Sequence, residues 1–225
     1  MVEATNQVTK TLYENYDNLI IKCVPNYRKI LQTITDNIDD AKNKILDIGI
    51  GTGNLEELLF KKLPQAKIVG IDTSANFLTI AKNKNINYQL QTVQADIRNY
   101  DIGEHKFDII LSSLAIHHFE DNQKYILFQG IYKALSDNGI FINFDMIKPE
   151  TEEEYLKLSD QLFERWKEHG LSNDFIEEEK KEMAERDRLV ELSKQKEWLE
   201  KIGFNFETVY EDGFFCIYTC KKIKK

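Results

Sequence analysis

A glycine-rich loop follows a short apolar stretch early in the chain. The stretch 45–48 contains one acid, Asp47, and Gly49, Gly51 and Gly53 follow it at two-residue intervals. Glycine lets the backbone turn sharply and lets a ligand lie against the main chain. The helix expected next offers free backbone N–H groups at its first turn. The loop therefore predicts a ligand site at the end of a strand.

The spacing of these glycines differs from the dinucleotide-binding fingerprint. Gly-x-Gly-x-x-Gly counted from Gly49 or from Gly51 requires a third glycine where the chain has Asn54 or Glu56. Asp47 would also lie unfavourably beside a pyrophosphate, whereas it suits a ligand with a cationic amino group. The loop therefore indicates a nucleoside-type ligand other than NAD.

Two further acids end the apolar segments that follow. Asp72 comes about 20 residues after the loop, the interval at which an acidic residue reaches ribose hydroxyls in nucleotide-binding folds. Its carboxylate can accept from both hydroxyls, and Thr73 is placed in the same site. Asp72 could instead, or also, cap the helix that starts near Ser74. Asp96 could accept from an exocyclic amine such as that of adenine, with Ile97 packed on the ring.

The middle of the chain alternates between short apolar strands and amphipathic helices. We expect strands at 44–48, 67–72, 88–94, 107–112 and 139–145, and helices at 55–63, 74–82 and 122–135. This alternation is typical of a parallel sheet covered on both faces. Segments 204–210 and 214–220, joined at Asp212-Gly213, predict a final hairpin and hence one antiparallel strand.

Helical segments flank this core, and we treat the chain as one domain, 1–225. Residues 1–40 form an expected N-terminal helical cap and 41–148 the core. Residues 149–202 read as a helical insertion, either a surface layer or a lid over a pocket, and 203–225 as the C-terminal hairpin.

The composition narrows the classes of partner. The net charge is −8, from 30 Lys and Arg against 38 Asp and Glu, which disfavours a nucleic acid as substrate. No apolar segment approaches the ~20 residues that span a bilayer, and the first residues lack a signal-peptide pattern. The 3 cysteines are not spaced as metal ligands. We expect a cytoplasmic protein with no membrane partner and no metal, and we leave a homodimer open.

Five segments together resemble the successive motifs of class I S-adenosylmethionine (SAM)-dependent methyltransferases. They match in order and spacing across roughly residues 40–145: Ile45–Leu55, Val69–Asp72, Gln94–Ile97, Phe107–Ser112 and Leu135–Phe141. The resemblance implies a Rossmann-like, seven-stranded, mostly parallel sheet whose last strand is antiparallel. It also implies SAM as cofactor and S-adenosylhomocysteine as product. The methionine part would lie near the glycines of the loop, the ribose on Asp72 and the adenine near Asp96 and Ile97.

The segment after the fourth expected strand bears on the methyl acceptor. Enzymes that methylate amino groups of DNA resemble Asn/Asp-Pro-Pro-Tyr/Phe here, whereas this chain has Ser112 followed by Ser-Leu-Ala-Ile and then His117 and His118. The segment is similar to small-molecule methyltransferases, with Ser112 beside the cofactor. Either histidine could remove a proton from the acceptor, since histidine titrates near neutral pH. Alternatively, one packs in the core and the other caps the next helix, and alignment alone drives the transfer.

The flanking regions resemble a subgroup that includes the carboxy-SAM synthases of tRNA wobble-uridine modification. The similarity lies in Val24–Tyr27 and in residues 182–204. It implies that Tyr27 touches the cofactor and that Arg188 binds an extra carboxylate. Ser112 stands where the synthase has asparagine, which weakens that implication.

Further residues complete the expected acceptor site. Asp145 ends the fifth strand and is placed at the pocket mouth, and Tyr13, Tyr16 and Asp17 are placed in the lid. The prediction is a SAM-dependent methyltransferase acting on an oxygen, nitrogen or carbon nucleophile of a small molecule. The alternatives are an enzyme that forms or uses carboxy-SAM, and a non-catalytic SAM-binding subunit whose 150–200 region is an interface.

Overall fold

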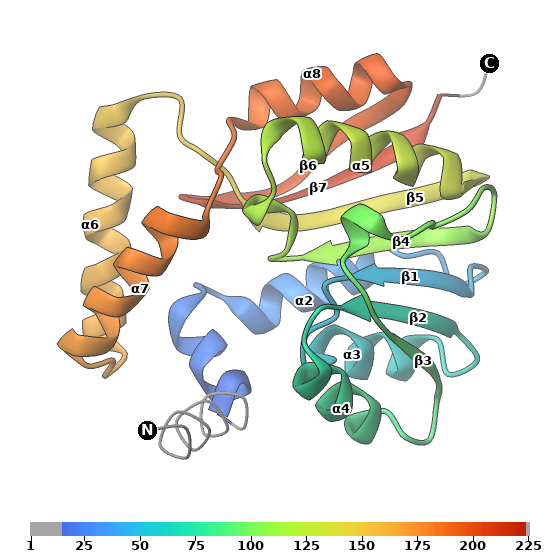
Figure 1. Cartoon of the computed structure of the whole chain (residues 1–225), viewed down its shortest axis with the longest axis horizontal. Helices are drawn as coiled ribbons and strands as arrows, with labels where there is room; N and C mark the ends of the chain where they lie inside the picture. The colour runs from blue at the N-terminus through green and yellow to red at the C-terminus, as the bar shows by residue number, and fades with distance from the viewer. Residues whose placement is uncertain (1–14, 224–225) are drawn as a thin grey trace.

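Seven strands form one sheet in the computed structural model, which describes residues 15–223 (Figure 1). Their order is β3-β2-β1-β4-β5-β7-β6. The strands are β1 Lys44–Ile48, β2 Lys67–Asp72, β3 Gln89–Gln94, β4 Phe107–Ser113, β5 Leu135–Met146, β6 Phe204–Asp212 and β7 Phe215–Lys222. All neighbours pair in parallel except β7, which is antiparallel to β5 and to β6. The predicted sheet with an antiparallel last strand is confirmed.

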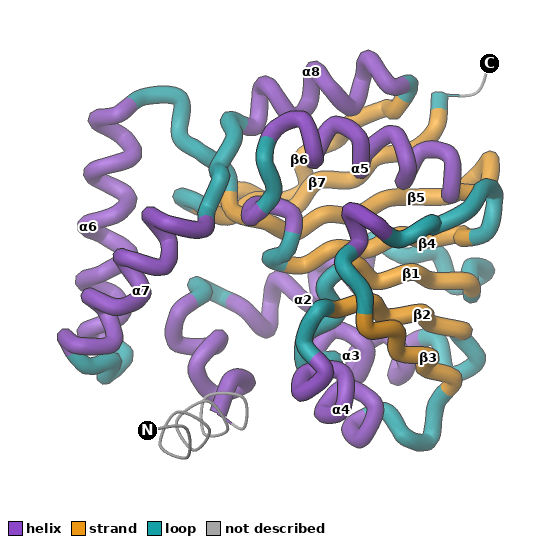
Figure 2. The backbone as a smooth tube through the Cα atoms, viewed as in Figure 1, coloured by secondary structure: helices purple, strands orange, loops and turns teal. Residues whose placement is uncertain are grey.

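Helices cover both faces of this sheet (Figure 2). They include α2 Tyr27–Asp36, α3 Asn54–Lys62, α4 Ala75–Lys84, α5 Asp121–Ala134 and α8 Leu192–Ile202. Successive side chains of a strand point to opposite faces, and β1 shows the result. Ile45 is buried in the same core cluster as Phe60 of α3. Leu46 is buried in the other cluster, with Phe128 of α5 and Leu199 of α8.

Two helices stand apart from the sheet, beyond the edge at which the parallel strands end (Figure 1). They are α6 Glu152–Glu168 and α7 Asn173–Arg186. Side-chain caps fix where they begin, because Thr151 accepts from Glu154 N and Ser172 accepts from Phe175 N. The indole of Trp166 donates to Cys23 O at 2.8 Å and ties α6 to the N-terminal helix, residues 15–23.

The predicted insertion therefore divides into two parts. Only α6 and α7 lie where a lid would lie, whereas α8 packs on the sheet beside α5. Leu199 explains the difference, since its side chain is fully buried in the sheet core. Within residues 15–223, no helix has both the length and the apolar character needed to cross a membrane.

Candidate functional site

The glycine loop leaves β1 in a conformation that side chains rarely adopt. Gly49 has φ +75° and Gly51 φ +56°. A Cβ at Gly49 would lie 2.4 Å from the Cβ of Ala115, in the segment after β4. At Gly51 the nearest atom would be Gly49 O at 4.0 Å. Gly49 is thus required by close packing as well as by φ, and the loop at Gly51 is open to an approaching ligand.

Asp72 holds this loop in place from the end of β2. Its Oδ2 accepts from Gly51 N at 3.0 Å and its Oδ1 accepts from Ser74 N at 2.8 Å. The N-cap of α4 is the Ser74 side chain, which accepts from Phe77 N. Thr73 is exposed, and its carbonyl accepts from Gln94 at 3.1 Å. Asp72 is half-buried, so its carboxylate organises the loop and stays accessible to a ligand.

A pair of buried carboxyl groups lies behind the loop. Asp47 and Glu56 are almost completely buried. In the described chain no other group donates to Asp47 Oδ1 or to either Glu56 oxygen, but the two side chains are close enough to share a hydrogen bond. Burial raises the pKa of Asp47 to about 6 and that of Glu56 further, since the Asp47 charge adds to the effect of burial. Glu56 therefore carries the proton at neutral pH and donates it toward Asp47.

Asp47 and the glycines line a small hollow, which we call the loop hollow. Its other walls include Tyr16, Tyr27, Ser113 and Leu114. Tyr27 and Tyr16 therefore lie beside the glycine loop, and their contacts with a ligand stay predictions. Ser112 does not, because its side chain is 1% exposed and its Oγ is buried without a partner in residues 15–223. Neighbouring residues of a strand face opposite sides, so Ser113 of β4 lines the loop hollow instead.

The predicted adenine contacts lie outside the loop hollow. Asp96 is bound by its neighbour Arg98, whose Nε lies 2.9 Å from Asp96 Oδ1. The Arg98 guanidinium lowers the pKa of Asp96. Ile97 is 6% exposed and packs in the sheet core. The carboxylate of Asp96 remains partly exposed, and Ile97 takes a structural place.

Asp17, which is expected in the lid, anchors the N-terminal helix. It accepts from Thr52 Oγ1 at 2.6 Å and from Asn54 Nδ2 at 3.0 Å, and it pairs with Lys84. The N-terminal helix is thereby tied to the glycine loop and to α4. No local signal predicts these contacts, because the partners of Asp17 lie 35 or more residues away along the chain.

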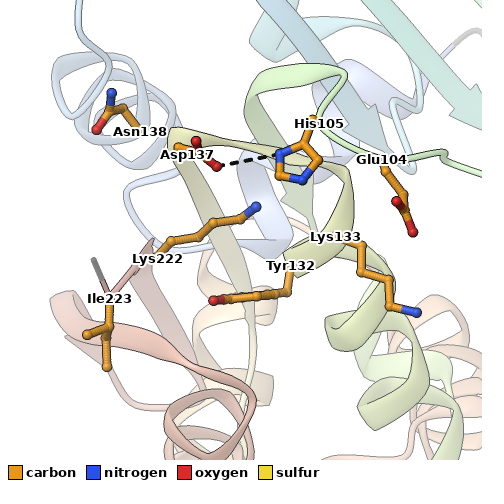
Figure 3. Close-up of a pocket in the computed structure, with 8 residues that line it drawn as sticks. All are labelled: Glu104, His105, Tyr132, Lys133, Asp137, Asn138, Lys222 and Ile223. Carbon is orange, nitrogen blue, oxygen red and sulfur yellow. Dashed lines mark ion pairs between the residues drawn. The ribbon is translucent and has the colours of Figure 1, made fainter. Parts of the chain in front are cut away.

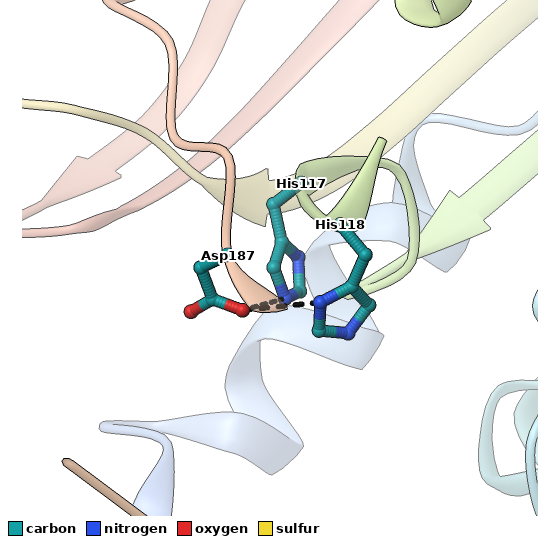
Figure 4. A group of neighbouring side chains, drawn as sticks. All are labelled: His117, His118 and Asp187. Atoms are coloured by element: carbon teal, nitrogen blue, oxygen red, sulfur yellow. Dashed lines mark ion pairs between the residues drawn. The ribbon is translucent and has the colours of Figure 1, made fainter. Parts of the chain in front are cut away.

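A second group of side chains lies after β4. His117 is almost buried; its Nδ1 pairs with Asp145 Oδ1, and its backbone N donates to Asp145 Oδ2 at 3.0 Å. Asp187 Oδ1 lies 3.6 Å from His117 Nε2 and 3.0 Å from His118 Nδ1 (Figure 4). Burial acts to lower the pKa of His117, but the Asp145 charge and hydrogen bond outweigh it and raise the pKa. We call His117, His118 and Asp187 the histidine cluster.

The histidine cluster faces a cavity of about 630 Å³, which we call the acceptor pocket. Aromatic and apolar side chains of the N-terminal helix, α6 and α7 form its walls: Ile20, Val24, Leu162, Trp166, Phe175 and Met183. Tyr16 and Leu114 line both the acceptor pocket and the loop hollow. Leu114 has φ +54°, an uncommon conformation for leucine. The two sites therefore meet at these two residues.

Two predicted acceptor contacts have other places, and a third is not described. Asp145 is 2% exposed, so it orients His117 rather than facing the pocket mouth. Arg188 does not line the acceptor pocket, because its guanidinium bonds to Glu120 at 2.8 Å and to backbone carbonyls. Tyr13 lies outside the described residues.

A cavity of similar size opens at the opposite edge of the sheet. It measures about 640 Å³ and lies where α5 ends and β5 begins. His105 and Asp137 on its rim form an ion pair of 3.5 Å, and Lys222 and Tyr132 line it (Figure 3). Active sites of open α/β sheets lie at the carboxyl ends of the strands. This position separates the cavity from the loop hollow.

Comparison with known proteins agrees with this geometry. Residues 45–139 match the family model of a methyltransferase domain. A carboxy-S-adenosyl-L-methionine synthase of Nitratiruptor sp. is 28% identical over 218 residues, which cover 93% of this chain and 90% of that protein. The matched family segment contains the glycine loop, Asp72 and both histidines.

Two solved structures share the fold. One is a SAM-dependent methyltransferase of Thermotoga maritima, a possible histamine N-methyltransferase, with a TM-score of 0.64 and 17% identity over 96% of this chain and 99% of that chain. The other is phosphoethanolamine N-methyltransferase 2 of Haemonchus contortus in complex with SAM. Its TM-score is 0.65, with 18% identity over 88% of this chain and 53% of that chain.

Proposed function

We propose that this chain is a class I SAM-dependent methyltransferase and that it methylates an uncharged or cationic small molecule held in the acceptor pocket. One observation carries the proposal. Tyr16 and Leu114 line both the loop hollow and the acceptor pocket, so a donor in one faces an acceptor in the other. Alignment of nucleophile, methyl group and sulfur is then the main contribution to the rate.

The residues of the loop hollow fit SAM. Asp47 has a buried oxygen with no partner other than Glu56 in the described chain, which suits the ammonium of the methionine part. The loop at Gly51 leaves room for a ligand, and the accessible Asp72 carboxylate suits the ribose hydroxyls. When bound, SAM supplies the electrophilic methyl group.

The acceptor class follows from the charges of the acceptor pocket. Glu178, Glu179 and Glu182 of α7 line it. Arg186, a basic residue on the same wall, is paired with Glu182 at 2.8 Å. The pocket therefore disfavours an anion, while its aromatic walls favour an apolar body. Its volume of about 630 Å³ lies in the range of small-molecule sites.

The histidine cluster is the group that activates the acceptor. An acceptor oxygen or nitrogen must lose its proton as the methyl group arrives, and the cluster is a polar group of the pocket next to Leu114. Asp145 fixes the ring of His117 from behind, so the ring faces the pocket in one orientation. We also propose a cytoplasmic location and no nucleic-acid partner, as the acidic composition suggests.

The proposal is tested with isotopically labelled SAM and an extract of small metabolites. We expect the label to appear in a molecule without a phosphate or carboxylate group, together with S-adenosylhomocysteine. Label found only in RNA or protein, or in an anionic metabolite, would contradict the proposed acceptor class.

A second candidate is the formation or use of carboxy-SAM, favoured by the synthase that matches 93% of the chain. That reaction needs a cation for the extra carboxylate, and Arg188 is instead paired with Glu120. Mass spectrometry of the nucleoside that co-purifies with the protein separates the two functions. Unmodified SAM or S-adenosylhomocysteine supports methyl transfer, whereas a carboxylated adduct supports the second candidate.

The Asp72→Ala variant is expected to bind SAM at least tenfold more weakly, which corresponds to about 1.4 kcal/mol. It loses the ribose contact and also the bond that holds Gly51 N. Titration calorimetry measures the change. Asp101→Ala is the matched control, since Asp101 accepts from Gly103 N at 2.8 Å in an exposed turn outside the loop hollow. Equal SAM affinity for a folded Asp72→Ala variant and the native protein would remove Asp72 from the site.

SAM affinity is expected to fall about fourfold between pH 7.0 and pH 5.5. The pKa of Asp47 is raised to about 6, so the ionised fraction that can hold an ammonium falls by that factor. The same raised pKa makes the native state bind the proton more tightly than the unfolded chain, so acid does not weaken the fold through Asp47.

Two variants test the assignment to this carboxyl pair in the same titrations. Asp47→Asn should bind weakly with no dependence on pH over this range. Glu56→Gln should keep the native affinity at pH 7.0, because its amide replaces the protonated carboxyl as donor to Asp47. A pH dependence that survives in Asp47→Asn would assign the effect to another group.

A further inference from the structure

We propose that the histidine cluster is a binding site for a divalent transition-metal ion on the wall of the acceptor pocket. The three donor atoms are His117 Nε2, His118 Nδ1 and a carboxylate oxygen of Asp187, and they all lie within 4.8 Å of one another. Figure 4 shows the two rings, from adjacent residues of one turn, converging with the carboxylate of Asp187 from a second segment of the chain.

The spacing of the donors fits a common ion. Ligands held about 2.0–2.2 Å from a metal at tetrahedral or octahedral angles lie about 2.8–3.6 Å apart. The Asp187 oxygen lies 3.0 Å from His118 Nδ1 and 3.6 Å from His117 Nε2, within that range. The second distance exceeds a hydrogen bond and matches the separation of two ligands of one ion.

The orientation of His117 points to the same conclusion. Asp145 pairs with Nδ1, so in the neutral ring the proton is on Nδ1 and the lone pair of Nε2 points at Asp187. In that neutral form the lone pair is free to bind a cation held between Nε2 and the Asp187 carboxylate. A carboxylate behind the other ring nitrogen is also the usual support of a metal-binding histidine, because it fixes the tautomer and the ring.

The backbone that carries the donors is held together by Lys124 of α5. Its ammonium donates to Phe119 O and to Arg188 O, at 2.5 Å for the second, and Arg188 N donates to His117 O at 2.9 Å. The segments that carry the histidines and Asp187 are therefore fixed relative to each other. The His118 side chain is 47% exposed and lines the acceptor pocket, which leaves room for further ligands on that side.

Two imidazoles and one carboxylate favour borderline ions such as Zn²⁺, Mn²⁺, Fe²⁺ or Co²⁺ over Mg²⁺, which prefers oxygen ligands. An acceptor oxygen or nitrogen bound to the ion would lose its proton more easily. That role for the ion rests on the proposed function. The ion site itself does not, because it is defined by the donors alone.

Metal binding is measured on the full chain after treatment with a chelator, with no SAM or acceptor present. Titration calorimetry with Zn²⁺ should give one site per chain, and Co²⁺ should produce visible absorption bands of a nitrogen- and oxygen-ligated ion. Mg²⁺ at the same concentration should give neither signal. Absence of Zn²⁺ and Co²⁺ binding to the folded native protein would overturn the proposal.

Variants locate the site. His118→Ala and Asp187→Asn should each weaken Zn²⁺ binding at least tenfold, and His118, being exposed, can be replaced without loss of the fold. His105→Ala is the matched control, since its imidazole also pairs with an aspartate, Asp137, at the opposite edge of the sheet (Figure 3). Native affinity in His118→Ala and Asp187→Asn would place the ion elsewhere and overturn the proposal. Because no methyl transfer is measured, failure here is distinct from failure of the proposed function.

Discussion

Replacing Gly49 by alanine is expected to lower the free energy of unfolding by about 2–5 kcal/mol and to weaken SAM binding at least tenfold. Two costs add. A non-glycine residue at φ +75° costs about 1–2 kcal/mol. The new methyl group would also stand 2.4 Å from the Cβ of Ala115, and forcing apart a packed contact costs about 1–3 kcal/mol. Urea unfolding and calorimetry measure the two effects.

Two further variants separate these costs. Gly51→Ala has a similar positive φ but open space around it, so it should lose only about 1–2 kcal/mol. The double variant Gly49→Ala, Ala115→Gly removes the clash and should recover stability relative to Gly49→Ala alone. Equal losses for Gly49→Ala and Gly51→Ala would show that the contact with Ala115 does not matter. The requirement for glycine at both positions would then come from the positive φ alone.

The sheet and the position of the glycine loop at its edge could be predicted because their signals are local. The strands 44–48 and 67–72 were predicted with the bounds that the structure has. The glycine loop and Asp72 each follow directly from such a strand, so their position at the sheet edge follows from the alternation itself. The Asp212-Gly213 turn likewise marks the final hairpin and its antiparallel strand.

The orientation of side chains within this frame could not be predicted. A shift of one position moves a strand residue to the other face, and this is why Ser113 rather than Ser112 lines the loop hollow. Asp145 lies one residue before the end of β5 and accepts from His117, a contact that depends on how the turn at 116–118 folds back. The sequence does not predict that Glu56 is buried against Asp47, because the two residues come together only in the folded chain.

The acceptor pocket was still harder to predict, because its lining residues come from distant segments of the chain. Asp187 directly follows α7, about 70 residues from the two histidines, so no local spacing in the sequence joins the three side chains. Arg188, in contrast, does not line the acceptor pocket. It lies next to Asp187 in the chain, but its side chain turns to Glu120 on the outside. The resemblance of residues 182–204 to a subgroup could place this segment near the pocket. It could not predict which of the neighbours Asp187 and Arg188 points into the pocket.

The Lys124→Met variant is expected to lose about 3 kcal/mol of unfolding free energy. Methionine replaces the aliphatic stem but not the ammonium, which is buried and bound to the carbonyls of Phe119 and Arg188. Each buried carbonyl left without a donor costs about 1–3 kcal/mol. Lys133→Met is the matched control, since Lys133 lies exposed on the same helix and should change stability by less than about 0.5 kcal/mol.

The same variant tests how the acceptor pocket is held together. Without Lys124, the segments at 117–119 and 187–188 keep the bond from Arg188 N to His117 O but lose the ammonium that joins them. The histidine cluster should then lose its fixed geometry while the loop hollow, which Lys124 does not line, stays intact. We expect kcat for methyl transfer to fall at least tenfold with little change in SAM affinity, and amide exchange at 187–190 to accelerate. If SAM affinity falls in parallel with kcat, the ammonium supports the whole fold rather than the acceptor side alone.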